Sequence, residues 1–592
     1  MEETMTVPRQ EHPRPQFVRS DWLSLNGAWQ FEIDPGNSGL ERSLLSRALS
    51  GTIQVPFCPE SKLSGIGNTD FLNAVWYRRA VTVPAAWKGK RVLLHFEAAD
   101  YDTTVWVGQT QVGRHRGGFT PFTFEITNEA APGKEVTLAV RCRDDHRLPK
   151  PRGKQSELHD RYSCLYDRTT GIWQTVWLEA VGASYLETPR ITPDLGRSLI
   201  RVEQPVVRAS GARLSVRAVL LDDQGEVARA EVAVGADFTP ALDLGVPAGR
   251  RRLWQPSDPH LYRLLLSLTD ASGAVVDQLE SYAGLRSVTI DGNRILLNGR
   301  PFFQRLILDQ GFYPDSLYTA PDDAALKRDI QLSLDAGFNG ARLHQKVFEQ
   351  RFLYHADRMG YLVWGELPDW GVDRERADAS TVAQWLEALH RDYSHPCIVG
   401  WCPLNETGQP LKEGIEGLDD LTLALYEATK GSDRTRPVLD ASGYSHRVAL
   451  PDVFDCHDYE QDVAKFTSNH ARTFQGAPFY NGPADRPWSL PYRGQPYLVS
   501  EFGGIWWNPK AAENEPSWGY GTRPRTVEEF YARFEGLCAA LLANPGVCGY
   551  CYTQLTDVFQ EQNGVYYFDR TPKFDLARLR AAQQKPAATE RG

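Results

Sequence analysis

The sequence predicts a multidomain protein in which two β-sandwiches, the second of immunoglobulin-like length, precede a (β/α)₈ barrel. Three observations lead to this prediction. The chain has 592 residues, about twice the roughly 250–300 residues that one hydrophobic core organises. Before about residue 290, short segments alternate hydrophobic and polar residues between turn residues, which is typical of sandwiches. Beyond it, apolar strands alternate with amphipathic helices, as they do in barrels.

The sandwich region divides in two at a seam near residues 181–195. Strand candidates before the seam are rich in aromatic residues, whereas those after it are plainer and fit an immunoglobulin-like domain. Turn-like sequences such as LDDQGE and TDASGA separate the later strands. The strand candidates before the seam are AVWYRRAVTV, RVLLHFEAA, TTVWVGQTQV, EVTLAVRCR and TVWLEAV, and those after it lie within residues 213–234 and 260–278.

Eight apolar segments after about residue 295 are strand candidates, and helices separate several of them. Asp322 and Asp323 precede a helix that ends at Gly337. Gly360 ends a second helix, and Pro396 follows a third. Eight strands that alternate with helices over roughly 250–300 residues indicate a (β/α)₈ barrel. The candidates are FFQRLILD, FNGARLH, YLVWGE, CIVGWCPLNE, RPVLDAS, DVFDCHDY, PYLVSEFG and GVCGYCYTQ.

Polar side chains end these strand candidates. The carboxyl ends of barrel strands meet at one mouth and carry the chemistry of barrel enzymes, while the strand interiors are packed. One polar end alone would mean only that a strand meets a loop, but a polar end on every strand predicts a ring of functional groups. The residues are Asp309, Arg342, His344, Glu366, Asn405, Glu406, Asp440, His457, Asp458, Glu501, Tyr552 and Gln554.

Two carboxylates in this ring, Glu406 on the fourth strand and Glu501 on the seventh, are expected to face each other across the mouth. Opposed carboxylates suit the cleavage of a glycosidic bond, in which one acid protonates the leaving oxygen. The second carboxylate either attacks the anomeric carbon or activates water. Carboxyl groups about 5–5.5 Å apart would retain the configuration, and groups ~6.5–9.5 Å apart would invert it. The residues alone leave both outcomes open.

The motifs in this chain resemble those of glycoside hydrolase family 2, the family of β-galactosidases, β-glucuronidases and β-mannosidases. The resemblance runs from about Arg14 to Lys573 and includes LNGAWQFEID, TTGIWQTVWLEAV and LRSVTIDGNRILLNGRPFF. WCPLNE resembles the motif of the family's acid/base, and VSEFGG resembles the motif of its nucleophile. The resemblance implies a jelly-roll sugar-binding-type domain at residues 14–182. It further implies an immunoglobulin-like sandwich at 183–286 and a catalytic barrel at 287–580.

For the site, the resemblance implies a retaining reaction with Glu406 as acid/base and Glu501 as nucleophile. Asn405 is expected to bind the sugar 2-hydroxyl, and Arg342 and His344 to keep Glu501 ionised. Further residues are expected to contact the substrate. Among them, His457 and Asp458 resemble a sugar-binding position of the family, and Trp506 and Trp507, which follow the nucleophile, are expected to form a wall on the leaving-group side. The further residues are Asp309, Glu366, His457, Asp458, Trp506, Trp507 and Tyr552.

The chain departs from the family pattern at three places. The family's Gly-Val-Asn-Arg-His stretch is replaced by FFQRLILDQGFYPDSLYTAPDD, and the Trp at the end of strand eight is expected to be Tyr552. EQNGVYYFDRTPK lacks the Asn-x-Lys motif that a β-glucuronidase would carry, which disfavours that activity. We therefore expect an exo-acting, β-galactosidase-like glycosidase. The alternatives are a β-mannosidase, an arabinosidase, a uronidase or a non-catalytic carbohydrate-binding protein.

Composition limits the other partners. The net charge of −10 argues against nucleic-acid binding, which normally uses a basic face. Apolar stretches are far shorter than the ~18–20 residues of a membrane span. The nine cysteines, odd in number, favour reduced thiols and therefore a cytoplasmic location. We expect a carbohydrate substrate, no cofactor and no metal, and the family's tendency favours a homo-oligomer.

Overall fold

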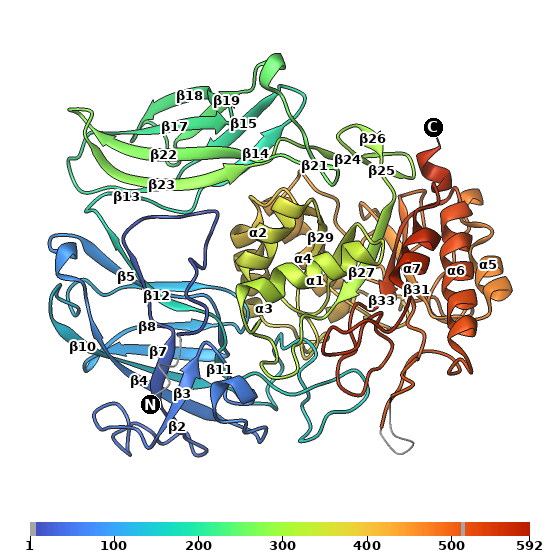
Figure 1. The fold of residues 1–592 in the computed structure, drawn as a ribbon, viewed down its shortest axis with the longest axis horizontal. Coiled ribbons are helices and arrows are strands. Elements are labelled where there is room, and N and C mark those ends of the chain that lie inside the picture. The colour runs from blue at the N-terminus through green and yellow to red at the C-terminus, as the bar shows by residue number, and fades with distance from the viewer. Residues whose placement is uncertain (1–6, 511–515, 592) are drawn as a thin grey trace.

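In the computed structural model, which describes residues 7–510 and 516–591, two β-sandwiches lie beside a barrel (Figure 1). The first sandwich, blue in Figure 1, has a six-stranded sheet in the order β3-β2-β4-β10-β7-β8 and a four-stranded sheet in the order β1-β12-β5-β9. Trp29, Tyr77 and Leu94 lie in its core. The strands are β1 (Trp22–Ser24), β2 (Gly27–Ile33), β3 (Gly51–Val55), β4 (Ala74–Thr82), β5 (Arg91–Phe96), β6 (Ala99–Asp100), β7 (Asp102–Val107), β8 (Thr110–Arg116), β9 (Phe122–Glu125), β10 (Glu135–Arg143), β11 (Gly171–Ile172) and β12 (Val176–Val181).

The second sandwich, green in Figure 1, has its own core around Val216, Leu264 and Leu279. Its main sheets have the orders β18-β17-β22-β23 and β14-β15-β19. Along β17 and β22, buried side chains alternate with less buried ones, because successive side chains point to opposite faces of a sheet. The strands are β13 (Tyr185–Leu186), β14 (Arg190–Asp194), β15 (Leu199–Glu203), β16 (Val206–Val207), β17 (Leu214–Asp222), β18 (Gly225–Ala233), β19 (Ala241–Gly245), β20 (Trp254–Gln255), β21 (Asp258–Pro259), β22 (Tyr262–Asp270) and β23 (Val275–Ala283).

The barrel follows a short antiparallel sheet of β24 (Val288–Asp291), β25 (Arg294–Leu297) and β26 (Arg300–Pro301). Seven parallel strands form its wall in the order β30-β29-β28-β27-β33-β32-β31. The strands are β27 (Gln304–Asp309), β28 (Gly340–Leu343), β29 (Leu362–Glu366), β30 (Ile398–Cys402), β31 (Phe454–Asp458), β32 (Tyr497–Gly503) and β33 (Val547–Thr553). The α-helices are α1 (Asp323–Asp335), α2 (Gln350–Met359), α3 (Ala379–Asp392), α4 (Gly417–Ser432), α5 (Val463–His470), α6 (Val527–Ala543) and α7 (Leu576–Gln583).

The barrel closes between β30 and β31 through the segment 437–442, where the sequence predicts a fifth regular strand. Instead of a full ladder, two isolated parallel bridges join Trp401 to Val438 and Asn405 to Ser442. Pro437 has no N–H to donate, so this segment pairs less regularly than its neighbours. The predicted architecture of two sandwiches and a barrel is confirmed, with this one position irregular.

The predicted helix boundaries follow from residues that satisfy the helix ends. Asp322 caps α1, because its side chain accepts a hydrogen bond from the backbone N–H of Ala325. Gly360 ends α2 with a positive φ of 70°, which glycine adopts without the strain that a side chain would add. These ends set where the following strands begin, and therefore where their carboxyl ends reach the barrel mouth.

A long connection between β10 and β11, residues 144–170, leaves the first sandwich and packs on the barrel. Tyr166 from this connection, together with Trp173 beyond β11, belongs to the hydrophobic core of the barrel. The backbone of residues 150–153 pairs with residues 368–371, through Lys150 N to Gly371 O at 2.9 Å and Arg152 N to Trp370 O at 3.0 Å. The first sandwich thus contributes directly to the loop layer above the barrel strands.

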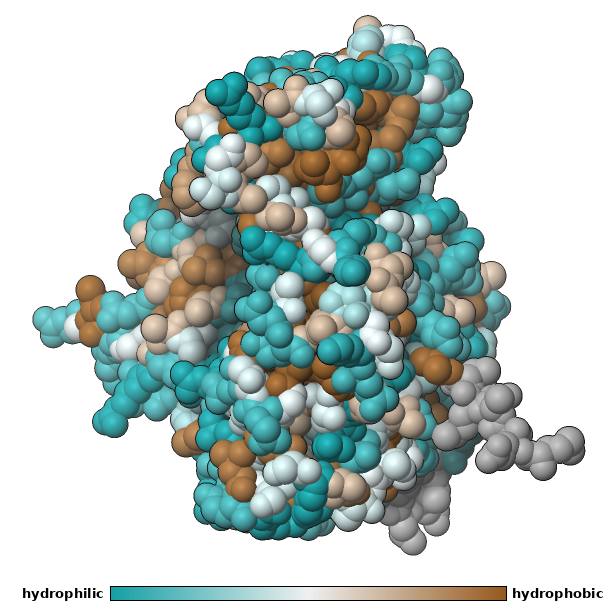
Figure 2. Space-filling view, turned by 90° about the vertical axis from the view of Figure 1, so that its left-hand side faces the viewer, coloured by the Kyte–Doolittle hydropathy of each residue, from teal (hydrophilic) through white to brown (hydrophobic). Residues whose placement is uncertain are grey.

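Figure 2 shows the side of the molecule formed mainly by the sandwiches. Hydrophilic residues cover most of this face, and hydrophobic residues gather most visibly on its upper part, where the second sandwich lies. Among the residues that the structure describes, no helix is both long and apolar enough to span a membrane.

Candidate active site

Arg342, on β28, is the buried centre of the barrel mouth. Its guanidinium donates hydrogen bonds to Glu366 Oε2 at 2.7 Å, to Glu501 Oε1 at 2.7 Å and to Asn405 Oδ1 at 2.7 Å. It also donates to the backbone oxygen of Ser500 at 2.9 Å. The planar fork of an arginine suits this arrangement, because its five N–H donors point in fixed directions. Arg342 therefore holds together three strands, β28, β29 and β32, and the segment that follows β30.

Glu366, at the end of β29, lies behind this arginine. Its Oε1 accepts a hydrogen bond from the backbone N–H of Gln345 at 2.9 Å and lies 3.0 Å from His344 Nδ1. Burial alone would raise the pKa of Glu366, but Arg342 and His344 outweigh burial and lower the pKa to about 2. Glu366 is therefore an anion that orients Arg342.

Glu501, on β32, receives hydrogen bonds on both carboxylate oxygens. Arg342 donates to Oε1, and the hydroxyl of Tyr459 donates to Oε2. Burial would raise the pKa of Glu501, but His457 and Arg342 lower it well below its usual range. A buried carboxylate that stays ionised and fixed in direction can act as a nucleophile.

Glu406 lies where the fourth strand leaves the barrel wall. Its φ of 51° is in the left-handed region, which residues other than glycine seldom occupy. The turn points the carboxylate back over the mouth, where Glu406 Oε1 lies 2.9 Å from His457 Nδ1. Its backbone is held on both sides, since its N–H donates to Ser442 O at 2.9 Å and its oxygen accepts from Arg374 at 2.9 Å.

His457, on β31, connects the two carboxylates. Its Nδ1 faces Glu406, and its Nε2 lies 3.5 Å from Glu501 Oε1 and 3.0 Å from Ser442 Oγ. Burial would lower the pKa of His457, but Glu501 and Glu406 raise it overall. One oxygen of Glu406, one oxygen of Glu501 and a nitrogen of His457 all lie within 4.8 Å of one another, a spacing that could also hold a metal ion.

Asn405 precedes Glu406 and is fully buried. Its Oδ1 accepts the hydrogen bond from Arg342, which directs its Nδ2 away from the arginine. Among the residues that the structure describes, Asn405 Nδ2 has no hydrogen-bond partner. A buried amide N–H without a partner is unfavourable, so this group is a candidate donor to a bound ligand.

The structure brings together seven of the predicted site residues and separates five. Asp458 points away from the mouth, since it accepts from Asn469 Nδ2 at 2.9 Å and lies 3.2 Å from His470 Nε2. Tyr552 also points outward, with its ring 5.1 Å from Phe534 of α6. The predictions that Asp458 and Tyr552 face the mouth were wrong for the same reason. Neighbouring side chains along a strand face opposite sides of it. The seven residues that meet are Arg342, His344, Glu366, Asn405, Glu406, His457 and Glu501.

Asp309 lies outside the cluster as well. Its Oδ1 accepts from Gly311 N at 2.9 Å, and burial together with the negative charge of Asp329 raises its pKa to about 6. The side chain of its neighbour Gln310 instead donates from Nε2 to Gln554 Oε1 at 2.5 Å and to Glu561 Oε2 at 3.4 Å. The side chain of Asp309, which we predicted to bind substrate, therefore makes no hydrogen bond or ion pair within the cluster among the residues that the structure describes.

We expected Trp506 and Trp507 to form a wall on the leaving-group side, but their contacts lie elsewhere. The ring of Trp506 packs against the guanidinium of Arg523, at 5.7 Å. Trp507 packs at the edge of the barrel core, and its backbone oxygen accepts from Lys573 Nζ at 2.8 Å. The ring next to Glu501 belongs to Tyr459, which stacks on Tyr520 with ring centroids 3.4 Å apart. These two tyrosines supply the aromatic surface.

Some neighbours of the carboxylates were missed from the sequence. Tyr459 could have been found, because it lies two residues after His457 and therefore on the same face of the strand. By the same alternation, Thr553 rather than Tyr552 faces the mouth, and its Oγ1 lies 3.1 Å from the Tyr459 hydroxyl. No local signal marks the others, which come from distant loops: Tyr444, Tyr520, Trp370 and Lys154.

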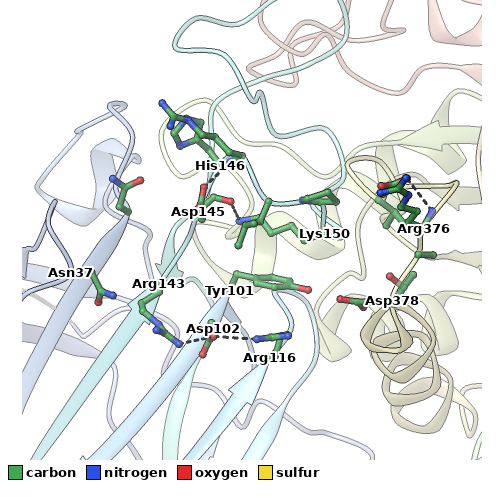
Figure 3. Close-up of a pocket in the computed structure, with 18 of the residues that line it drawn as sticks. Asn37, Tyr101, Asp102, Arg116, Arg143, Asp145, His146, Lys150, Arg376 and Asp378 are labelled. Atoms are coloured by element: carbon green, nitrogen blue, oxygen red, sulfur yellow. Dashed lines mark hydrogen bonds and ion pairs between the residues drawn. The ribbon is translucent and has the colours of Figure 1, made fainter.

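A separate open cavity of about 840 Å³ lies between the first sandwich and the barrel. Figure 3 shows Tyr101 on its floor, with Arg376 and Asp378 from the barrel side. Asp102 lies between Arg143, at 2.8 Å, and Arg116, at 3.7 Å. The whole lining carries four aspartates and five arginines or lysines, so the cavity has no strong excess of either sign. They are Asp102, Asp145, Asp373, Asp378, Arg116, Arg143, Arg147, Lys150 and Arg376.

Replacing Arg342 with methionine is expected to destabilise the barrel by about 3–5 kcal/mol at pH 7, because Glu366 and Glu501 would remain buried without their cation. The folded pKa of Glu366 lies below its ordinary value, so the ion pair stabilises the fold fully above about pH 4.5. This stabilisation is lost as the pH falls toward 2. The difference in melting temperature between wild type and Arg342→Met should therefore be large at pH 7 and shrink at pH 3.

Arg217→Met is the matched control for this experiment. Arg217 forms an exposed ion pair with Glu231 at 2.9 Å, and such pairs contribute about 0–1 kcal/mol. Its melting temperature should stay close to that of wild type at both pH values. An equal loss for Arg342→Met at pH 7 and pH 3 would show that the ion pairs are not the cause.

Comparisons with known proteins agree with this fold. Residues 22–148 match "Glycosyl hydrolases family 2, sugar binding domain", and residues 184–286 match "Glycosyl hydrolases family 2". A β-glucuronidase of Paenibacillus borealis is 28% identical over 450 residues, which cover 70% of this chain and 72% of that protein. A β-galactosidase of Thermoanaerobacter pseudethanolicus is 26% identical over 74% of this chain, but the match spans only 57% of its own length.

The fold also matches a solved β-glucuronidase of Ruminococcus gnavus in complex with D-glucuronic acid, with a TM-score of 0.78 and 19% identity. The match covers 98% of this chain and 100% of that one. Two sandwiches and a barrel with paired carboxylates at its mouth define a multidomain barrel glycosidase. The chain belongs to glycoside hydrolase family 2.

Proposed function

We propose that the protein is a retaining, exo-acting β-glycosidase whose nucleophile is Glu501 and whose acid/base is Glu406. The spacing of the two carboxylates carries this proposal. One oxygen of each lies within 4.8 Å of the other, which suits the roughly 5–5.5 Å separation of retaining enzymes better than the ~6.5–9.5 Å of inverting ones. The difference in environment supports the assignment of roles, because Glu501 is buried and doubly hydrogen-bonded whereas Glu406 is partly exposed.

In the first step, a Glu501 oxygen forms a bond to the anomeric carbon while the bond from that carbon to the leaving oxygen breaks. Glu406 in its acid form gives its proton to the leaving oxygen. Asn405 Nδ2, which has no partner among the described residues, donates to the sugar 2-hydroxyl. Such a contact strengthens in the transition state and so lowers the barrier.

In the second step, water replaces Glu501 at the anomeric carbon. Glu406, now a carboxylate, takes a proton from the water as the water oxygen attacks. The ester bond to Glu501 breaks, and the carboxylate is restored with Arg342 and Tyr459 as its hydrogen-bond donors. Two inversions give a product with the original configuration.

For the sugar, we propose a β-hexuronide, and the named relatives support this choice. β-Glucuronidases of Paenibacillus borealis and Felis catus are 28% and 27% identical to the chain. A neutral β-galactoside is the second candidate. The missing Asn-x-Lys motif favours the galactoside. The buried acid Glu561, next to Gln310, also favours it, because an acid and an amide bind the hydroxyl groups of a sugar better than they bind a sugar carboxylate.

A panel of 4-nitrophenyl β-D-glycosides tests the proposal. We expect kcat/KM on the glucuronide to exceed that on the galactoside, mannoside and arabinoside by about 100-fold or more, because a site built for a charged group rejects analogues that lack it. Proton NMR should show the β-anomer as the first product. Higher turnover of a neutral sugar would overturn the uronide assignment, and a first product of α configuration would overturn the retaining mechanism.

A further inference from the structure

Lys154 reaches the barrel mouth from the first sandwich. It lies in the connection 144–170, where its backbone oxygen accepts from Tyr166 N at 2.8 Å and the adjoining Gly153 N donates to Pro368 O at 3.2 Å. The residue is 6% exposed, and its Nζ lies 4.9 Å from the centroid of the Trp370 ring. Trp370 Nε1 in turn donates to the backbone oxygen of Asn405 at 3.4 Å. The ammonium is thus next to the catalytic segment.

The other buried lysines have partners for their charge. Lys150, four residues earlier and on the wall of the cavity in Figure 3, forms an ion pair with Asp144. Lys346 donates to Gly311 O and to Tyr318 O, both at 2.7 Å. Lys154 has only the face of Trp370, and in the described ranges, 7–510 and 516–591, no hydrogen bond or ion pair engages its Nζ. A buried ammonium without a paired anion is unfavourable.

The nearby acids do not take up this ammonium. Glu561 accepts from the Tyr166 hydroxyl and, at 3.2 Å, from Asn563 Nδ2. Burial works to lower the pKa of Lys154, yet Cys164, Glu561 and the more distant carboxylates raise it overall, so the side chain stays protonated. The ammonium therefore presents free N–H donors to the mouth of the barrel.

We propose that Lys154 binds the carboxylate of a β-hexuronide substrate and so determines the enzyme's preference for uronides over neutral sugars. This inference rests on the proposed function. An ammonium supplies the charge that a late Asn-x-Lys motif would otherwise provide, and this chain lacks that motif. The cation comes here from the sandwich domain instead of the barrel.

The test compares 4-nitrophenyl β-D-glucuronide with 4-nitrophenyl β-D-glucoside, because the two differ only in the carboxylate at C6. For Lys154→Met, kcat/KM on the glucuronide should fall about 10- to 200-fold, the range expected when a hydrogen bond to a charged group is lost. The ratio of glucuronide to glucoside turnover should fall nearly as much. Lys154→Arg, which keeps the charge, should restore part of the ratio. Lys154→Gln gives the same comparison should the methionine variant fold poorly.

Lys88→Met is the control, since Lys88 is exposed and lies on the first sandwich; it should leave the ratio unchanged. An equal fall on both sugars would overturn the inference, because it would show that Lys154 acts through Glu501 and not through the substrate carboxylate. Wild-type turnover of the glucoside but not of the glucuronide would overturn the uronide assignment and, with it, this role. If wild type prefers the glucuronide and Lys154→Met keeps that preference, the role of Lys154 is overturned and the uronide assignment stands.

Discussion

Replacing Glu501 with glycine is expected to lower kcat on the order of 10⁵-fold, because the glycosyl-enzyme can no longer form. The space left by the side chain lies between the former donors Arg342 and Tyr459, so a small anion fits there. Azide should attack an activated 2,4-dinitrophenyl β-glycoside from that side in a single displacement. The product should be the α-glycosyl azide, identified by NMR.

Glu501→Gln is the control for this rescue. The amide fills the same volume without the charge, so the variant should be inactive and azide should not restore it. In wild type, a 2-fluoro glycosyl fluoride of the accepted sugar should label Glu501, as peptide mass spectrometry can show. A label on another residue, or a β-glycosyl azide from Glu501→Gly, would contradict its role as nucleophile.

Replacing Glu406 with alanine is expected to lower kcat/KM about 10²- to 10⁴-fold on substrates with poor leaving groups, which need protonation. The loss should be much smaller for a 2,4-dinitrophenyl glycoside, which leaves as a stable anion. The second step also needs Glu406, so the glycosyl-enzyme should accumulate and give a burst of dinitrophenol. Azide, which needs no base, should accelerate turnover and yield the β-glycosyl azide.

Glu413→Ala is the matched control for this variant. Glu413 lies seven residues further along the same loop and is exposed, and its loss should change neither the burst nor the dependence on the leaving group. A uniform loss of Glu406→Ala activity on good and poor leaving groups would contradict the acid/base role. The opposite configurations of the two azide products distinguish the roles of Glu406 and Glu501 in one assay.

The barrel strands and the paired carboxylates could be predicted from the sequence because local patterns encode them. Apolar strands of four to seven residues lead into polar side chains, and the fold brings those ends to one mouth. The capping role of Asp322 was equally local. The fifth strand was harder, because Pro437 disrupts the ladder that the apolar pattern alone predicts.

Side-chain direction along the strands could have been predicted but was not. His457 and Tyr459 share a face, and Asp458 lies on the other, as the period of two requires. The same rule places Thr553 at the mouth and turns Tyr552 toward α6. The polar residues at each strand end were assigned to the mouth together, although successive side chains along a strand point alternately toward the mouth and away from it.

The sequence by itself determined the fold class and the pair Glu406 and Glu501, because hydrophobic periodicity and strand ends are local properties of the chain. Only the tertiary structure decided what surrounds the pair. His457 lies between the carboxylates because β31 and the segment after β30 meet across an irregular fifth position. Lys154 reaches them from a different domain, about 250 to 350 positions away in sequence. Contacts of that range depend on how whole domains pack, and no local pattern in the sequence encodes them.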